Sequence, residues 1–322
     1  MTLEARPARL LRERHARATL DVVAAGTFRP QGGRYDVRRV RLRAVRALRG
    51  GESGLVASFR LVAGSVEITI LARDPACSAE DIAWAMTAAR GMAAVDDDPR
   101  EFLAIADRHP LVGALAAKLD CRIERMPTVF ESFARAVIEQ LVTTFEARAA
   151  IRRLFRRSGE LVGGTELRAP PTAQAVLGVA PWELHAMGIG SRRCRTLREG
   201  ARRGAALERL RDVPPELAAE KIQSLPGVGP WTANLVASTA LGWSDAVPVG
   251  DFHAPYVITE ALTGEQGGDA EMLEALAPFR PHRARVVRLI TQAQMADALP
   301  GFERLRRRLP RVDPHRRKPW KY

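Results

Sequence analysis

The feature that most constrains the fold is a short Gly- and Pro-rich segment between two helical patterns, Leu225-Pro226-Gly227-Val228-Gly229-Pro230. The preceding helix is predicted to end at Ser224, and Pro230 suits the first turn of the next helix. Two glycines around one small apolar residue permit backbone torsions that other residues avoid. The pattern predicts a tight hairpin whose free N–H groups form a site for an anion such as a DNA phosphate. An ordinary helix–helix turn that needs glycine is the alternative.

From about residue 100 onward the sequence has helical periodicity. Apolar residues between 130 and 145 recur at helix spacing behind a capping box that begins at Thr128, and they define one apolar face. Short connections rich in Gly and Pro separate further segments. Helices are expected at 173–179, 181–187, 191–203, 215–224, 230–241, 252–262, 269–276 and 282–296.

The N-terminal part has a different pattern. Apolar and charged residues alternate within 37–49, which favours a strand with one solvated face, and 55–62 and 66–71 are further strand candidates. Ser78 begins a capping box that opens a helix through about residue 90. The run Asp96-Asp97-Asp98-Pro99 marks a domain boundary, because a charge run that ends in Pro is rare inside an element. Residues 1–98 are therefore expected to form a small α+β domain.

The charge balance indicates a polyanionic partner. The 322 residues are 46% hydrophobic, which is enough for a substantial core, and 50 Lys and Arg against 37 Asp and Glu give a net charge of +13. Nucleic acid or an anionic membrane surface would suit that charge, whereas a generally Arg-rich protein is the alternative. No stretch approaches the roughly 20 apolar residues of a spanning helix, and no signal-peptide core follows the N-terminus. A cytoplasmic protein without a membrane partner is expected.

Cysteine usage argues against several cofactors. Cys77, Cys121 and Cys194 are odd in number and far apart in the sequence. Neither a disulfide framework nor a CxxC-type zinc site can be built from them, and three cysteines are too few for a four-cysteine iron–sulfur cluster. We expect reduced, partly buried thiols and no cofactor.

The hairpin and the segment after it resemble the helix-hairpin-helix superfamily of DNA glycosylases. LPGVGPWTA, from Leu225 to Ala233, is similar to their hairpin, and VPVGDFH, from Val247 to His253, is similar to the loop that carries their catalytic aspartate. The resemblance covers about 100–295 and is closest to the 3-methyladenine DNA glycosylase II (AlkA-like) branch, which also carries an N-terminal antiparallel-sheet domain. It implies a mainly α fold, with an N-terminal α+β domain over 1–98 and a helix-hairpin-helix glycosylase domain over 99–300. The many arginines after Phe302 add the expectation of a basic tail over 301–322.

The resemblance makes Asp251 the candidate catalytic residue. Cleavage of an N-glycosidic bond passes through an oxocarbenium-like sugar, which a carboxylate beneath it stabilises. Asp251 is expected at a helix N-terminus, where a plain N-cap is the alternative role. Asp245 is a rival that lacks the VPVGDFH context. Trp231 stands where bifunctional members place a Schiff-base lysine, so the resemblance implies hydrolysis by water.

The resemblance also implies contacts with DNA and with the base. Leu141 would fill the gap left by a flipped nucleotide, unless it is an ordinary core leucine. Leu235 and Thr291 stand where bacterial alkylpurine enzymes place aromatics, which leaves the substrate open. A turn at Gly188-Ile189-Gly190 would shape the base pocket or be purely structural. A monovalent cation is implied at the carbonyls of Leu225 and Val228. The implied DNA-binding residues are Leu225, Pro226, Gly227, Val228, Gly229, Thr232, Gln140 and Leu141, and the implied pocket residues are Trp231, Phe252 and Leu235.

The function expected from these features is monofunctional DNA N-glycosylase activity of the 3-methyladenine glycosylase II type. Such an enzyme would excise damaged, alkylated purines from double-stranded DNA, and a monomer is the default. Two alternatives stay open at this point: a non-catalytic helix-hairpin-helix DNA-binding protein, and a glycosylase for oxidised or deaminated bases.

Overall fold

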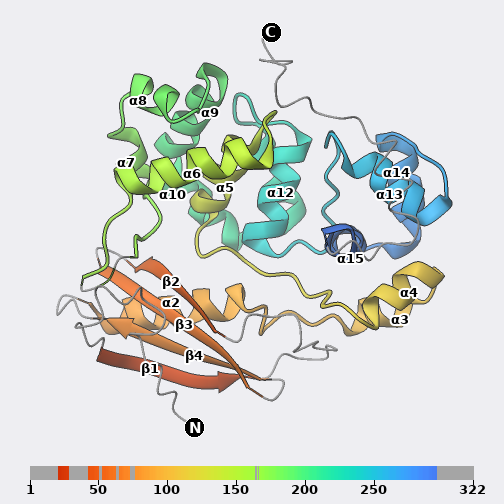
Figure 1. Ribbon diagram of the computed structural model, residues 1–322, viewed down its shortest axis with the longest axis horizontal. Coiled ribbons are helices and arrows are strands. Elements are labelled where there is room, and N and C mark those ends of the chain that lie inside the picture. Colours follow the sequence, from red (N-terminus) through yellow and green to blue (C-terminus); the bar gives the residue numbers. More distant parts are fainter. Residues whose placement is uncertain are drawn as a thin grey trace.

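The computed structural model describes most of the helical part and a sheet near the N-terminus. The described residues are 21–28, 43–50, 53–62, 65–72, 77–163, 165 and 167–295. The expected basic tail at 301–322 lies outside them, as does the start of the strand predicted within 37–49. Figure 1 shows the sheet and one helix below a larger group of helices. The predicted fold class, mainly α with a smaller N-terminal α+β part, is confirmed.

The N-terminal strands form one antiparallel sheet in the order β1-β4-β3-β2. Every residue of the inner strand β4 is buried. Three of the strands match predicted segments, whereas β1 was missed because its Ala24-Ala25-Gly26 run shows no alternation of apolar and charged residues. The strands are β1 (Asp21–Phe28), β2 (Arg43–Gly50), β3 (Ser53–Val62) and β4 (Ser65–Ala72).

The described helices gather mainly around two apolar clusters. The larger cluster surrounds Phe133 and the smaller one surrounds Phe279. None of the helices in the described ranges is long and apolar enough to cross a bilayer. The elements of the larger cluster are α5 (Val129–Glu139), α6 (Thr144–Ser158), α7 (Ala173–Leu177), α8 (Pro181–Ala186), α9 (Ser191–Arg202), α10 (Gly204–Glu208), η2 (Arg209–Asp212), α11 (Pro215–Gln223) and α12 (Pro230–Leu241). Those of the smaller cluster are α3 (Arg100–Ala106), α4 (Pro110–Ala116), α13 (Ala254–Thr263), α14 (Asp269–Leu276), η3 (Ala277–Phe279) and α15 (Arg283–Met295).

The sheet is covered on both faces. Helix α2 (Ala79–Met92) starts at the predicted capping box of Ser78 and packs its Ala85 against Ile68 and Ile70 of β4. On the other face, Leu71 of β4 packs with Val162, which lies in the connection after α6. This second contact joins the sheet to the helical part.

The predicted boundary at Asp96–Pro99 is an ordered connection held by ion pairs. Asp97 accepts hydrogen bonds from both terminal nitrogens of Arg285 in α15, one of them at 2.9 Å, and from the backbone N–H of Ile123. The Arg285 side chain is only 4% exposed and also donates to the Cys121 carbonyl. The segment therefore fastens the start of the helical part to its last described helix.

The prediction of one helical face from 130 to 145 was wrong. Helix α5 ends at Glu139, Leu141 has a φ of 51°, and α6 begins behind a capping box formed by Thr143 and Glu146. That capping box starts a new helix because its side chains satisfy the N–H groups of a first turn. Leu141 and Phe145 consequently leave the core and are 57% and 77% exposed.

Two of the cysteines are inert core thiols. Cys121 and Cys194 are buried and form no disulfide. Burial raises the pKa of the Cys121 thiol to about 11, so it stays protonated at neutral pH and is a poor nucleophile.

Candidate active site

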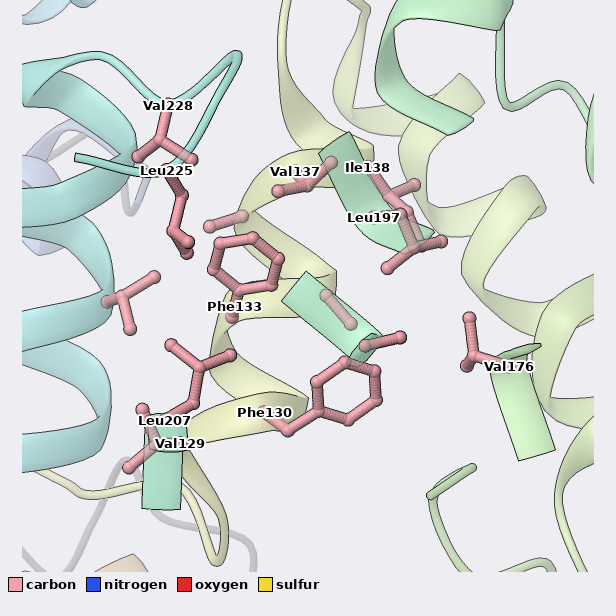
Figure 2. Packing of buried hydrophobic residues seen from close by; sticks show 14 of the residues in the cluster. Val129, Phe130, Phe133, Val137, Ile138, Val176, Leu197, Leu207, Leu225 and Val228 are labelled. Atoms are coloured by element: carbon pink, nitrogen blue, oxygen red, sulfur yellow. The ribbon is translucent and has the colours of Figure 1, made fainter. Parts of the chain in front are cut away.

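The predicted hairpin joins α11 to α12 and is anchored by its apolar residues. Leu225 and Val228 are buried and point toward Phe133 and Val137 of α5 (Figure 2). Pro226 and Gly227 are exposed. The N–H groups of Gly227 and Gly229 have no acceptor among the described residues, so they are available to an anion.

Gly227 is the position where the hairpin requires glycine. Its φ is +83°, and a Cβ there would lie 2.0 Å from the Thr196 hydroxyl oxygen. We expect Gly227→Ala to lower the free energy of unfolding by about 1–3 kcal/mol and to weaken DNA binding. Gly229→Ala is the matched control, because Gly229 has a φ of −101° and open space around its Cβ position. Urea denaturation of both variants checks the prediction, and equal losses would contradict it.

Gln140 and Thr232, both implied to bind DNA, bond to each other. Thr232 is 2% exposed, and its hydroxyl accepts a hydrogen bond from the Gln140 amide at 2.9 Å. The same amide donates to the Gly227 carbonyl at 3.1 Å. Figure 1 shows the α5–α6 turn beside the α11–α12 hairpin, on the side of the helices away from the sheet. Gln140 therefore fastens this turn to the hairpin, and Thr232 is buried behind it.

Leu141 projects from that turn into solvent. Its exposure excludes the core-leucine alternative, and a positive φ is uncommon for leucine, so the surrounding contacts must impose it. Beside it, the Arg193 guanidinium donates to the Ile138 carbonyl at 2.7 Å and to the Gly188 carbonyl at 2.8 Å. The Gly188–Gly190 turn thus braces the end of α5, whether or not it also shapes a base pocket.

Asp251 lies at the start of α13, where three N–H groups hold its carboxylate. Oδ1 accepts from the backbone N–H of His253 at 2.8 Å and of Ala254 at 2.9 Å. Oδ2 accepts from the Trp231 indole N–H at 2.8 Å. The N-cap residue of α13 is His253, so Asp251 is not itself the N-cap as the alternative supposed. The backbone N–H groups at the start of α13 fix one oxygen of this half-buried carboxylate, and the indole of α12 fixes the other.

The backbone of the Asp251 loop is held by two further residues that sequence reasoning missed. The Asn234 side chain donates to the Val247 carbonyl at 2.8 Å. Gly250, at a φ of +85°, donates its N–H to both carboxylate oxygens of Asp269 at 3.0 Å. Asn234 follows Trp231 by three positions in a helix and so shares its face, which was a usable signal. Asp269 gave no such signal.

The indole hydrogen bond can be removed with little change in packing. Trp231→Phe is expected to lower the rate of any reaction that depends on the Asp251 carboxylate by roughly tenfold or more, because a hydrogen bond to a charged group contributes about 1.5–3 kcal/mol. Trp243→Phe is the control, since the Trp243 indole N–H has no acceptor among the described residues. Single-turnover kinetics would test this, and equal rates for the two variants would rule out a role for the bond.

The other implied pocket residues are less closely tied to Asp251. Phe252, next in the chain, is 45% exposed and packs edge-to-face on His253 with ring centroids 4.8 Å apart. Leu235, one turn after Trp231, packs against the larger apolar cluster and is only partly exposed. Among the three, Trp231 is the residue that the structure brings to the carboxylate.

Asp245, the alternative candidate for the catalytic carboxylate, forms an ion pair with Arg283. Its two oxygens accept from Nε and Nη2 of Arg283 at 2.8 and 2.7 Å. This bidentate pair fixes the start of α15 and leaves Asp245 a structural group. Within the described residues, no group of three or more His, Cys, Asp and Glu side chains is arranged to hold a metal ion.

Comparison with curated proteins gives partial matches. No family model matches the chain. A probable bifunctional transcriptional activator/DNA repair enzyme AlkA of Mycobacterium tuberculosis is 28% identical over 174 residues, covering 53% of this chain and 35% of the relative. DNA-3-methyladenine glycosylase 2 of Escherichia coli is 32% identical over 133 residues, covering 40% of this chain and 46% of the relative. The matches thus span less than half the length of either relative.

Solved structures match over more of the chain. A 3-methyladenine DNA glycosylase from Archaeoglobus fulgidus is 20% identical, with a TM-score of 0.69 over 80% of this chain and 88% of that one. A Clostridium acetobutylicum 8-oxoguanine glycosylase/lyase, solved with double-stranded DNA, is 15% identical, with a TM-score of 0.58 over 78% of this chain and 88% of that one. The fold is therefore that of the helix-hairpin-helix DNA glycosylases. The sequence matches are to proteins named AlkA and DNA-3-methyladenine glycosylase 2.

Proposed function

We propose that this chain is a monofunctional DNA glycosylase that removes a damaged base from double-stranded DNA by hydrolysis. The observation that carries the proposal is the Asp251 carboxylate, held by the Trp231 indole on one oxygen and by the start of α13 on the other. Trp231 belongs to the helix that the hairpin opens, so the carboxylate is coupled to the candidate phosphate site.

In the proposed reaction Asp251 acts mainly through its charge. As the bond between sugar and base breaks, positive charge develops on the sugar, and a fixed carboxylate stabilises it without having to reorient. Water then attacks the sugar. Trp231 has no amine that could form a Schiff base, which favours hydrolysis over strand cleavage by a lyase step.

DNA would be bound through backbone donors and one apolar side chain. The free N–H groups of Gly227 and Gly229 suit a phosphate, and the overall charge of +13 favours a polyanion. Leu141 is positioned to enter the duplex and replace a nucleotide that rotates out. Gln140 would keep that side chain in register with the hairpin.

The substrate we propose is an alkylated purine. Such a base is cationic and leaves readily, so one carboxylate can suffice without a strong general acid. Trp231 and Phe252 offer aromatic surface, to which a cationic base is attracted. The name of one curated relative, DNA-3-methyladenine glycosylase 2, points to the same substrate class.

The hairpin is also compatible with the monovalent cation that the resemblance implies. The Leu225 carbonyl accepts the Val228 N–H at 3.1 Å and keeps a second lone pair. The Leu225 and Val228 carbonyls are neutral oxygen ligands, a type that suits such an ion. A bound cation would add positive charge next to the phosphate.

The test is excision from duplex oligonucleotides that each carry one lesion: hypoxanthine, ethenoadenine, a methylated purine or 8-oxoguanine. We expect abasic sites at an alkylated purine, with strand breaks only after alkali. Breaks without alkali would contradict hydrolysis, and excision of 8-oxoguanine alone would overturn the substrate. Duplex binding with no excision of any lesion would favour a non-catalytic binding protein.

A further inference from the structure

Helix α6 presents an outward stripe that no part of the core uses. Phe145, Arg148, Arg152 and Arg156 follow one another at intervals of three, four and four residues, so they share one face of the helix. All four are exposed. The three arginines form no hydrogen bond or ion pair with any described residue, in contrast to Arg157, which pairs with Glu183. We call these four residues the α6 stripe.

We propose that the α6 stripe is a second DNA-contacting surface, which extends the interface from the Leu141 wedge along the phosphates of one strand. The proposal rests on the proposed function, because the wedge defines where the duplex lies. Phe145 follows Leu141 by four residues and contacts the DNA beside the gap. The three arginines contact phosphates farther from the lesion.

The position and the charge of the α6 stripe support DNA as its binding partner. Helix α6 begins at the turn that Gln140 fastens to the hairpin, so the stripe is continuous with the candidate phosphate site. From Arg148 to Arg156 the helix rises about 12 Å, which is the axial length of three to four nucleotides of one strand. Glu146 is the only acidic residue of α6, and its carboxylate is occupied by the Thr143 N–H and hydroxyl.

Exposed aromatic and cationic groups on one face also fit DNA better than a purely solvated surface. Exposure of a phenylalanine side chain to water is unfavourable, whereas the same side chain can pack on unstacked bases and sugars beside a kink in the DNA. Glu139 interacts with Arg148 through charge alone, and since the three arginines form no hydrogen bond with a described residue, their N–H groups are open to phosphate oxygens.

The test measures affinity for a duplex with a stable abasic-site analogue between 50 and 200 mM salt. The logarithm of the affinity falls linearly with the logarithm of the salt concentration. In the triple variant Arg148→Ala/Arg152→Ala/Arg156→Ala, this slope should become less negative by about 0.9 for each phosphate contact that is lost. Over this range its affinity should therefore fall about 40-fold less than that of the wild type. Phe145→Ala should weaken binding about fivefold or more at every salt concentration, with an unchanged slope.

Control variants distinguish DNA contact by the α6 stripe from a non-specific effect of net charge. They also test the stripe separately from the proposed glycosylase activity. Lys118→Ala/Arg209→Ala/Arg280→Ala removes three exposed cations elsewhere and should keep the wild-type slope. A stripe variant that binds like the wild type overturns the inference, even if the wild type excises bases normally. A stripe-dependent slope in a protein that excises nothing would retain the surface and overturn the enzyme. Thermal unfolding should be unchanged for all these surface variants.

Discussion

Asp251→Asn is expected to lower the rate of base excision by at least about 10²- to 10³-fold while duplex binding persists. That range is typical for the loss of one preorganised charge-stabilising group, and here a full negative charge is removed. The measurement is single-turnover excision on the lesion that the wild type processes best, together with affinity for the uncut duplex. Retention of more than a third of the wild-type rate would eliminate Asp251 as the catalytic carboxylate.

The geometry sharpens this test. Three donors converge on the two Asp251 oxygens, but an asparagine amide offers only one oxygen. Either the indole or the start of α13 must lose its partner in the variant. Trp231→Phe should therefore slow the wild type yet have little further effect in the Asp251→Asn background, because the two groups act as a unit. Additive losses would mean that Trp231 acts on the base independently. Asp212→Asn, an exposed acid in η2, serves as the control.

Features that depend on local sequence were predictable. The hairpin glycines and Pro230 have backbone requirements that can be read directly, and the structure places both around a tight turn with Gly227 at positive φ. The break before α6 was also encoded, in the Thr143–Glu146 capping box, but the apolar periodicity across it concealed the signal. Here the capping chemistry was the more reliable guide, because periodicity continued across a turn whose apolar residues face solvent.

Features that depend on tertiary contacts were not predictable from the chain. The resemblance implied that Trp231 lines the base pocket, but it did not reveal that the Trp231 indole N–H donates to Asp251. It implied that Gln140 contacts DNA, but not that the Gln140 amide bonds to the hairpin. Both cases involve a polar group whose partner lies many residues away. Sequence patterns can identify the type of residue that a site needs, but not which of its atoms are already occupied.

Asp97→Ala is expected to lower the free energy of unfolding by about 3–5 kcal/mol. The substitution would leave the buried Arg285 guanidinium without its counter-ion, and removing one partner of a buried pair costs far more than the pair contributes. The Ile123 N–H would lose its acceptor as well. Urea denaturation monitored by circular dichroism measures the loss.

Two further variants show whether burial is the reason. Asp96→Ala breaks a more exposed pair with Arg90 and should cost no more than about 1 kcal/mol. Adding Arg285→Met to Asp97→Ala should restore part of the lost stability, because it removes the uncompensated charge. Similar losses for Asp96→Ala and Asp97→Ala, or no recovery in the double variant, would refute this account of the connection. Since Asp97 lies outside the Asp251 site, each variant should excise bases at the wild-type rate while it remains folded, so stability and catalysis can be measured as separate properties of this chain.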